Sequence, residues 1–342
     1  MDPLTHVLAG AALGALFAPR GYTRHAAAAG AVVAALPDLD VLIGSEFDPL
    51  LSVEMHRHFS HALVFAPVLA ALVAALATRL FKVPFMSWWW RLIPAAVSAG
   101  LLDACTSYGT ELLWPFAHER VALAVIAVVD PLFTVILACT LVFALLNERP
   151  ALAGLGLALA GCYLMVGTMQ QSRGEWALRS LAHDRGHVVE QLVVKPTLGN
   201  LLVWRGVYRA KGRIYADAIR LGLGSGLMLY PGLNASHVTT NASALPENSV
   251  LANDARRFAR LSDGFLVRHP SKPMLVGDAR FSMSPDGITP MFAITIDANK
   301  PDAHAPYHEL REWDAGAWER FKAMLQGASL PRLQSLKRET LL

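Results

Sequence analysis

Long apolar runs alternate with short polar stretches over the first half of the chain. A helix needs about 20 residues to cross the hydrocarbon core of a bilayer, and the second, third and sixth runs reach that length. The first and fourth runs are shorter, and we expect them either as half-membrane helices or as helices packed inside a bundle. The pattern therefore predicts an all-α membrane domain of about six helices, two of them short. The runs cover residues 4–18, 25–43, 62–80, 92–104, 131–146 and 151–169.

Capping residues mark where several of these helices begin. Asp2 and Asp130 each precede a proline, so an N-cap acceptor stands before the residue best suited to the first helical position. Ser60 can cap the third helix. Residues 121–129, VALAVIAVV, are apolar but too short to span a bilayer, and we expect an extended or re-entrant stretch there.

The pattern changes in the second half of the chain. Residues 171–190 are expected to continue the last helix out of the membrane, and the residues around Lys211-Gly212 alternate as in a β-hairpin. PMLVGDARFSMS and TPMFAITID read as further strands, and PYHELREWDAGAWERFKAML reads as a helix. We therefore predict two domains, a membrane domain over residues 1–170 and a small soluble α+β domain over residues 171–342.

Composition agrees with this division. Hydrophobic residues make up 54% of the chain and its mean hydropathy is +0.37, whereas a soluble domain is about 45–50% apolar. The net charge of +3 is too small to indicate a nucleic-acid partner. All three cysteines lie in the apolar half, so we expect no disulfide framework in the soluble half. No cleavable signal peptide is expected, because a basic region before the first apolar run is missing.

The charges of the loops predict how the membrane domain is oriented. If the helices run alternately up and down, the loops 19–24, 79–91 and 147–150 fall on one side and carry most of the Lys and Arg of this half. The positive-inside rule places these loops in the cytoplasm. Six crossings would then place the soluble domain outside the membrane.

Histidines and aspartates from separate helix ends gather on the opposite predicted side. Ionisable groups at a membrane boundary are costly and usually functional. Imidazole and carboxylate together are the ligands of Zn²⁺, Mn²⁺ or Fe, and no cysteine lies on this side. The alternative is structural, because a single histidine at a helix end often only caps it or meets water. The group comprises His6, Asp38, Asp40, His56, His58, His61, Asp103 and Asp130.

The spacing within HRHFSH, residues 56–61, leaves two arrangements open. His58 and His61 share a helix face if the third helix begins early. His56 and His61 converge only if residues 56–59 form a turn.

Five motifs together resemble the YdjM/YbcI-type family of bacterial inner-membrane proteins, which is labelled a family of metal-dependent hydrolases. The motifs are DPLTH, PDLD, HRHFSH, DACTSYGTELLWPF and DPLFT, which cover about residues 1–170. The resemblance implies an all-helical core distantly akin to zinc-dependent phospholipase C and single-strand-specific nucleases. An N-terminal amine binds metal in those enzymes, but Met1 and Asp2 precede His6 here, so the amine is left out of the implied ligands. These are His6, Asp38, Asp40, His56, His61 and Asp103.

The residue types also suit hydrolysis. One to three divalent ions, zinc or manganese, could activate water, and Asp38 or Asp40 could accept its proton. Arg57 could bind a phosphate through two hydrogen bonds, or could form a salt bridge with Glu54 or an aspartate. The remaining candidates for contacts with the ligands or the substrate are Asp2, His58, Thr106, Tyr108 and Asp130.

The sequence thus predicts an integral membrane metal-dependent hydrolase. We expect it in the bacterial inner membrane, with its site facing outward and a phosphate ester of a lipid or lipid-linked molecule as its substrate. One alternative is a metal or proton transporter, which would carry ionisable groups near the middle of its helices. The other is a non-catalytic scaffold in which metal only holds the helices together.

Overall fold

The computed structural model describes residues 1–222, 224, 226–239, 245–311 and 316–333. The chain divides into two compact units. The helical unit comprises Met1–Ile43, Glu54–Met169 and Leu198–Asn200, and the sheet unit comprises the remaining segments, including Gly44–Val53 and Gln170–Thr197.

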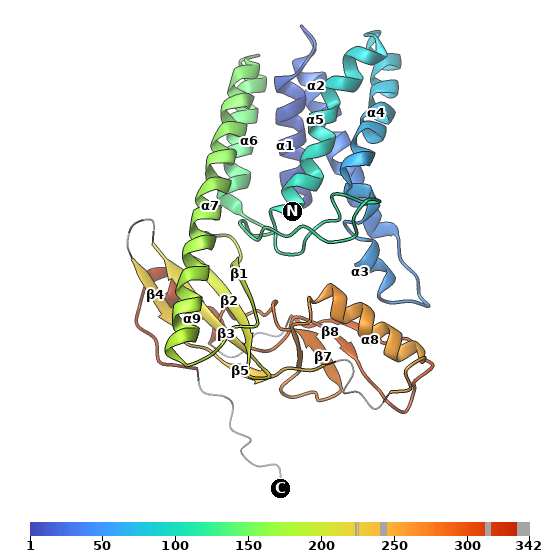
Figure 1. The fold of residues 1–342 in the computed structure, drawn as a ribbon. Helices are drawn as coiled ribbons and strands as arrows, with labels where there is room; N and C mark the ends of the chain where they lie inside the picture. The colour runs from blue at the N-terminus through green and yellow to red at the C-terminus, as the bar shows by residue number, and fades with distance from the viewer. Residues whose placement is uncertain (223, 225, 240–244, 312–315, 334–342) are drawn as a thin grey trace. The chain divides into compact units, whose positions relative to one another are not determined.

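Most of the helical unit consists of long helices, which are joined by short loops and by longer irregular stretches over residues 36–65 and 105–130 (Figure 1). The irregular stretch after the second helix contains the short helical turns η1 (Leu36–Leu42), η2 (Phe59–His61) and η3 (Leu63–Phe65). The short helix α3 (Leu51–Met55) begins in the sheet unit and ends in the helical unit. The long helices are α1 (Pro3–Leu16), α2 (Thr23–Ala35), α4 (Ala66–Phe81), α5 (Phe85–Ala104), α6 (Pro131–Leu146) and α7 (Pro150–Asp184), which continues into the sheet unit.

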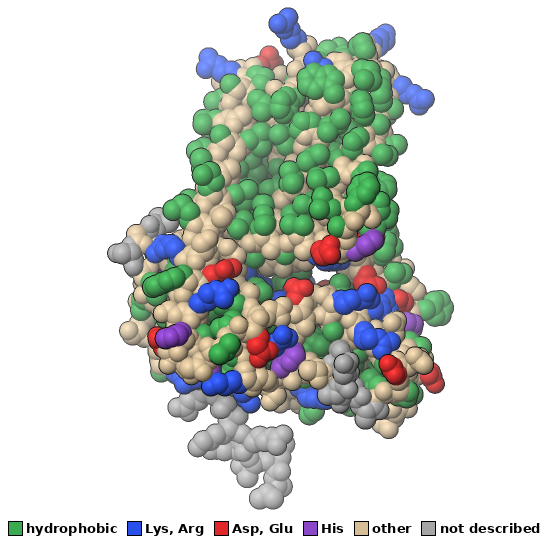
Figure 2. Space-filling view, viewed as in Figure 1, with side chains coloured by type: hydrophobic (Ala, Val, Ile, Leu, Met, Phe, Trp, Pro, Cys, Tyr) green, Lys and Arg blue, Asp and Glu red, His purple; other side chains and the backbone are tan. Residues whose placement is uncertain are grey.

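Three helical segments are long and apolar enough to cross a membrane within the described residues. They are Thr23–Leu42, Leu63–Phe81 and Pro150–Asp184, while α1 and α6 are shorter apolar helices. The predicted helical membrane region is therefore confirmed, but the count of six membrane helices is not. Hydrophobic side chains cover the sides of this unit in Figure 2, and Lys and Arg gather at the end where the loops α1–α2, α4–α5 and α6–α7 lie.

Two helix starts differ from the prediction. Helix α5 begins at Phe85 and not at residue 92, because Trp88 is fully buried and packs into the core formed with α2 and α4. Helix α4 begins at Ala66, and Ser60 donates its hydroxyl to Asp40 instead of capping a helix. The HRHFSH segment is therefore free to form turns.

Helices α1 and α2 cross through small residues. A Cβ at Gly10 would lie 2.4 Å from the carbonyl oxygen of Gly30, and one at Gly14 would lie 2.1 Å from that of Ala26. Only glycine permits such close backbone contact, as in other membrane helix pairs. The contact brings the start of α1 next to the end of α2.

Within the part of the chain that the structure describes, the sheet unit contains two antiparallel sheets, so the predicted α+β domain is confirmed in this form. The first has the order β1-β2-β3-β4, with β5 paired to β3, and the second has the order β6-β7-β8-β9. Helices α8 (Val250–Leu261) and α9 (Ala317–Gln326) also belong to this unit. The strands are β1 (Gln191–Pro196), β2 (Val203–Ala210), β3 (Arg213–Leu221), β4 (Leu227–Tyr230), β5 (Asn234–Ser236), β6 (Leu266–Arg268), β7 (Leu275–Asp278), β8 (Phe292–Thr295) and β9 (Tyr307–Glu309).

The sheet unit follows the predicted pattern except at its two ends. The exit helix predicted over residues 171–190 ends at Asp184. Strands β2 and β3 form the predicted hairpin, with Lys211 at φ 51° and Gly212 at φ 67° in its turn. Strands β7 and β8 lie in the two predicted stretches. The predicted helix over PYHELREWDAGAWERFKAML is wrong at its start, because Tyr307–Glu309 pairs with β8 as a strand. Residues 312–315 of that stretch lie outside the described residues.

Candidate metal centre

Four segments of the helical unit bring ionisable side chains into one buried cluster. Helix α1 contributes His6 from its first turn, and α5 contributes Asp103 from its last. The turn η1 contributes Asp38 and Asp40, and the HRHFSH segment contributes its residues from a loop that ends in η2. His6 and Asp103 are fully buried.

His6, Asp38 and Asp103 form the centre of the cluster. One ligand atom from each lies within 4.8 Å of the others, which is close enough for all three to bind one metal ion. Nε2 of His6 lies 3.2 Å from Oδ1 of Asp103. Nε2 of His61 lies 3.1 Å from Oδ2 of Asp103 and 3.4 Å from Oδ1 of Asp38.

A glycine allows His61 to reach this position. A Cβ at Gly100 would lie 2.3 Å from the backbone carbonyl oxygen of His61, so only glycine leaves room for that loop against α5. Gly100 lies nearly one helical turn before Asp103, which explains why the imidazole of His61 meets the Asp103 carboxylate.

Asp40 holds the HRHFSH segment in place. Its Oδ1 lies 2.7 Å from Nδ1 of His56, and its Oδ2 accepts hydrogen bonds from the backbone N–H of Arg57 at 2.8 Å and from the hydroxyl of Ser60 at 2.7 Å. His56 and His61 therefore converge through a turn, which is the second of the two arrangements that the spacing allowed. Both oxygens of Asp40 are engaged in fixing these side chains.

The hydrogen bonds define which nitrogen of His61 carries the proton. Ser60 gives its single hydroxyl proton to Asp40, so the oxygen of Ser60, 2.9 Å from Nδ1 of His61, accepts from that nitrogen. Nε2 of a neutral His61 then presents a lone pair toward Asp38 and Asp103. Such an arrangement is repulsive by itself, and it is the orientation of a metal-binding histidine whose other nitrogen donates to a neighbouring group.

The charges and unpaired atoms of the cluster fit a divalent cation. Three carboxylates face one guanidinium, that of Arg57, in a place largely closed to water. Burying charge without compensation is costly, so a cation among these carboxylates would stabilise the arrangement. Within the described residues, hydrogen-bond partners are missing for Nδ1 of His6, Oδ2 of Asp38, Nε2 of His61 and Oδ2 of Asp103.

Arg57 is strained and buried. Its φ of 61° lies in the left-handed region, which a residue other than glycine adopts mostly where its surroundings impose it. Its Nη2 lies 3.1 Å from Asp103, and its Nη1 donates to the hydroxyl of Thr106 at 2.9 Å. Burial lowers the pKa of Arg57 to about 10, against the opposing effect of Asp38, so the guanidinium stays charged at neutral pH. The salt bridge to an aspartate is thus the arrangement that the structure contains.

The Met1 amine was left out of the implied ligands, yet it lies in the cluster, where it contacts the carboxylate of Asp103. Burial lowers the pKa of this amine to about 4, which leaves it neutral, with a free lone pair, at pH 7. Helix capping could have revealed this position. Asp2 is the N-cap of α1, so Met1 stands just before the cap and His6 four residues into the helix, and side chains at these two positions commonly meet.

The remaining candidates lie around the cluster or outside it. Asp2 and Asp130 cap α1 and α6, and the hydroxyl of Tyr163 donates to Asp130 at 2.8 Å. The ring of Tyr108 lies 5.6 Å from the guanidinium carbon of Arg57. His58 points to a different carboxylate, that of Glu111, at 3.2 Å.

These features define a helical membrane protein with a buried histidine–aspartate centre. The chain belongs to the YdjM inner membrane protein family, whose model matches residues 1–174. The match includes the four motifs that supply the residues of the centre, namely DPLTH, PDLD, HRHFSH and DACTSYGTELLWPF.

Two similar proteins carry names without a stated activity. The inner membrane protein YbcI of Escherichia coli (strain K12) is 37% identical over 94 residues, which cover 27% of this chain and 54% of YbcI. The uncharacterized protein YfhP of Bacillus subtilis (strain 168) is 26% identical over 208 residues, which cover 58% of this chain and 62% of YfhP. The matches thus span less than two thirds of either relative. No solved structure matches the chain. The family and its apolar helices support a location in the inner membrane.

Proposed function

We propose that this protein is an integral membrane metal-dependent hydrolase. The observation that carries the proposal is the orientation of His61, whose Nε2 faces Asp38 and Asp103 while Nδ1 is tied to Ser60. We assign metal binding to His6, Asp38, His61 and Asp103. A divalent ion, zinc or manganese, would act there as a Lewis acid and lower the pKa of bound water.

We assign different roles to the two ends of the HRHFSH segment. Asp40 orients both His56 and His61 through its two oxygens. The side chain of His56 is 42% exposed, and its Nε2 is available to accept a proton from water or to return one to a leaving group. We prefer this proton-transfer role for His56 over metal binding, because its Nδ1 lies 2.7 Å from Asp40, whereas Nε2 of His61 lies 3.1 Å from Asp103 and 3.4 Å from Asp38.

The proposed substrate is a phosphate ester of a lipid or lipid-linked molecule. Arg57 supplies a fixed positive charge beside Asp103, and Tyr108, which is 38% exposed, extends the site toward the outside. The cluster is built from helix ends, so a substrate anchored in a bilayer could present its head group there. By the positive-inside rule, the basic loops at the opposite end of the helical unit would face the cytoplasm and the site would face the periplasm.

A transporter is the main rival from another class. Its ion-binding groups would be expected near the middle of the membrane helices. Here the cluster takes His6 from the start of α1, Asp103 from the end of α5 and the rest from turns, which favours a surface enzyme.

The test is to measure metal content and hydrolysis together. Detergent-purified protein would be analysed by elemental mass spectrometry and assayed on a panel of lipid phosphate esters, beside the variants Asp38→Asn and His61→Ala. The control is Asp184→Asn, which changes a carboxylate that is 74% exposed. We expect both site variants to lose metal and turnover, while the control keeps both. Full turnover in His61→Ala would refute the proposal, and metal loss without any esterase activity in the wild type would favour the scaffold.

A further inference from the structure

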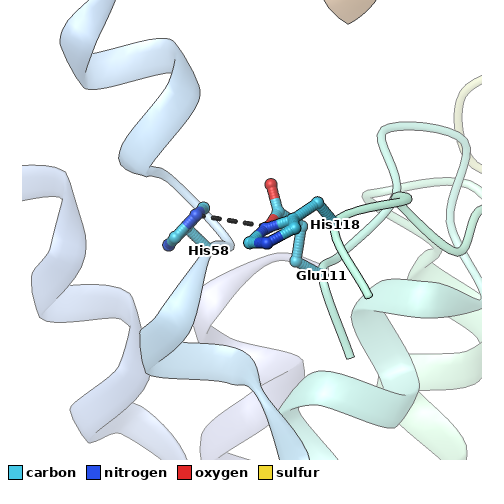
Figure 3. Close-up of side chains that lie close together, drawn as sticks. All are labelled: His58, Glu111 and His118. Atoms are coloured by element: carbon cyan, nitrogen blue, oxygen red, sulfur yellow. Dashed lines mark ion pairs between the residues drawn. The ribbon is translucent and has the colours of Figure 1, made fainter. Parts of the chain in front are cut away.

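A second group of possible metal ligands lies in the helical unit, made of residues that the proposed function does not use. Nε2 of His58 lies 3.2 Å and Nδ1 of His118 lies 3.8 Å from the same oxygen of Glu111, Oε2. One ligand atom from each residue lies within 4.8 Å of the others. Figure 3 shows the three side chains close together, with His58 on one segment and Glu111 and His118 on another.

The carboxylate of Glu111 is poorly satisfied by its neighbours. Glu111 is only 8% exposed, and among the described residues no group makes a hydrogen bond to its Oε2. The imidazole of His58 is close enough for a hydrogen bond but does not align as a donor. A protonated histidine that merely paired with the carboxylate would form a short, aligned hydrogen bond. Arg120 pairs with the other oxygen, since its Nε lies 4.0 Å from Oε1. The buried Oε2 is left without a hydrogen bond, which is costly and favours a cation bound at that oxygen.

The backbone holds two of the three ligands in place. The N–H of Glu111 donates to the carbonyl oxygen of Arg57 at 3.1 Å, next to His58. Thr110 and Val121 pair across the loop that carries Glu111 and His118. This pairing closes the loop, so Glu111 and His58 face each other before any ion binds.

We propose that His58, Glu111 and His118 bind a zinc ion. Two imidazoles and one carboxylate are a common ligand set for zinc, and they leave the fourth tetrahedral position open. The side chain of His118 is 72% exposed, so this position is reachable from water. The ion would link the HRHFSH segment to the loop 110–121 and thereby hold Arg57, which lies between the linked residues and the buried cluster. This site does not depend on the proposed function.

The experiment compares zinc content among matched histidine variants of the full-length protein. Wild type, His118→Ala and His183→Ala would be dialysed in detergent against a zinc buffer, and the zinc bound per chain would be measured by elemental mass spectrometry. His183 is the matched control, because it is also exposed and its Nδ1 also lies 3.8 Å from a carboxylate. A fourth sample, Glu111→Gln, removes the charge of the carboxylate and keeps its size.

We expect His118→Ala and Glu111→Gln to bind about one zinc ion per chain fewer than wild type, and His183→Ala to match wild type. Since His118 is exposed, its removal should leave the fold intact, which the melting temperature would check. Equal zinc content in wild type and His118→Ala would overturn the inference. Zinc lost from Asp38→Asn but not from His118→Ala would reject this second site alone. The opposite pattern would reject the buried centre and keep the second site.

Discussion

Replacing Gly100 with alanine should separate the geometry of the centre from its composition. The added Cβ would lie 2.3 Å from the carbonyl oxygen of His61, whereas ordinary contact begins at 3.4 Å. The His61 loop would have to retreat by about 1.1 Å, or α5 would have to move by the same amount. No ligand atom is removed by this change, so any loss of metal must come from displaced geometry.

The expected magnitude follows from two opposing terms. Overpacking of this kind costs about 1–3 kcal/mol, while alanine gains about 1 kcal/mol over glycine within a helix. Gly161→Ala is the matched control, because Gly161 also lies within a helix, α7, and a Cβ there would meet nothing within 4 Å. The gain of alanine over glycine within a helix is the same in both variants. The free energy of unfolding of Gly100→Ala should therefore be about 1–3 kcal/mol lower than that of Gly161→Ala.

The assay is thermal unfolding in detergent, followed by metal analysis. We expect a melting temperature lower by about 2–4 °C for each kcal/mol lost. A 1 Å displacement can also reduce catalysis by about a hundredfold, so any hydrolytic activity should fall with the bound metal. If Gly100→Ala had the same melting temperature as Gly161→Ala and kept its metal, the close approach of α5 to His61 would not be a determinant of the site.

Three further predictions concern the metal, a buried ion pair and pH. Removing metal with a chelator should lower the melting temperature of wild type by more than that of His61→Ala, which keeps only the second site, and an equal response of both proteins would contradict the assigned ligand. Asp217→Ala should cost about 3–5 kcal/mol by leaving the charge of Arg185 without its carboxylate, against almost nothing for the exposed Asp184→Ala; thermal unfolding in detergent measures the difference, and similar melting temperatures would speak against the pair. Partial burial raises the pKa of Asp48, but the hydrogen bonds from Arg257 outweigh it, so the net effect is a lowered pKa. The stability that Asp48 adds over Asp48→Asn should therefore be full above about pH 4 and disappear as the pH falls through the lowered pKa, as pH-dependent melting would show; a constant difference would rule out this titration.

The membrane half could be predicted from sequence because hydrophobicity is a local property. Apolar runs of sufficient length identify the spans, and Asp2 and Asp130 cap the helices that follow them. The hairpin around Lys211-Gly212 was predicted for the same reason, since its turn residues and its alternation are adjacent in the chain. The start of α5 was missed because the burial of Trp88 depends on packing against other helices.

The sequence predicted that histidines and aspartates of separate motifs would gather, but it missed the Met1 amine and the arrangement of the cluster. The motifs brought together His6, Asp38, His61 and Asp103, and the structure places all four in one buried cluster. The sequence could not distinguish the aspartate that faces Nε2 of His61 from the aspartate that only orients the HRHFSH segment. Asp38 and Asp40 look equivalent two residues apart, and only the turn η1 directs Asp40 to the HRHFSH segment.

The sequence alone determined a helical membrane protein with histidines and aspartates at its helix ends. The tertiary structure decided which of these groups meet. His61 can approach α5 only because Gly100 has no side chain. The direction of the HRHFSH segment depends on the positive φ of Arg57. The position of Glu111 beside His58 depends on how a loop pairs with itself. Irregular backbone has no period from which such contacts can be read, so they arise only when distant segments pack together.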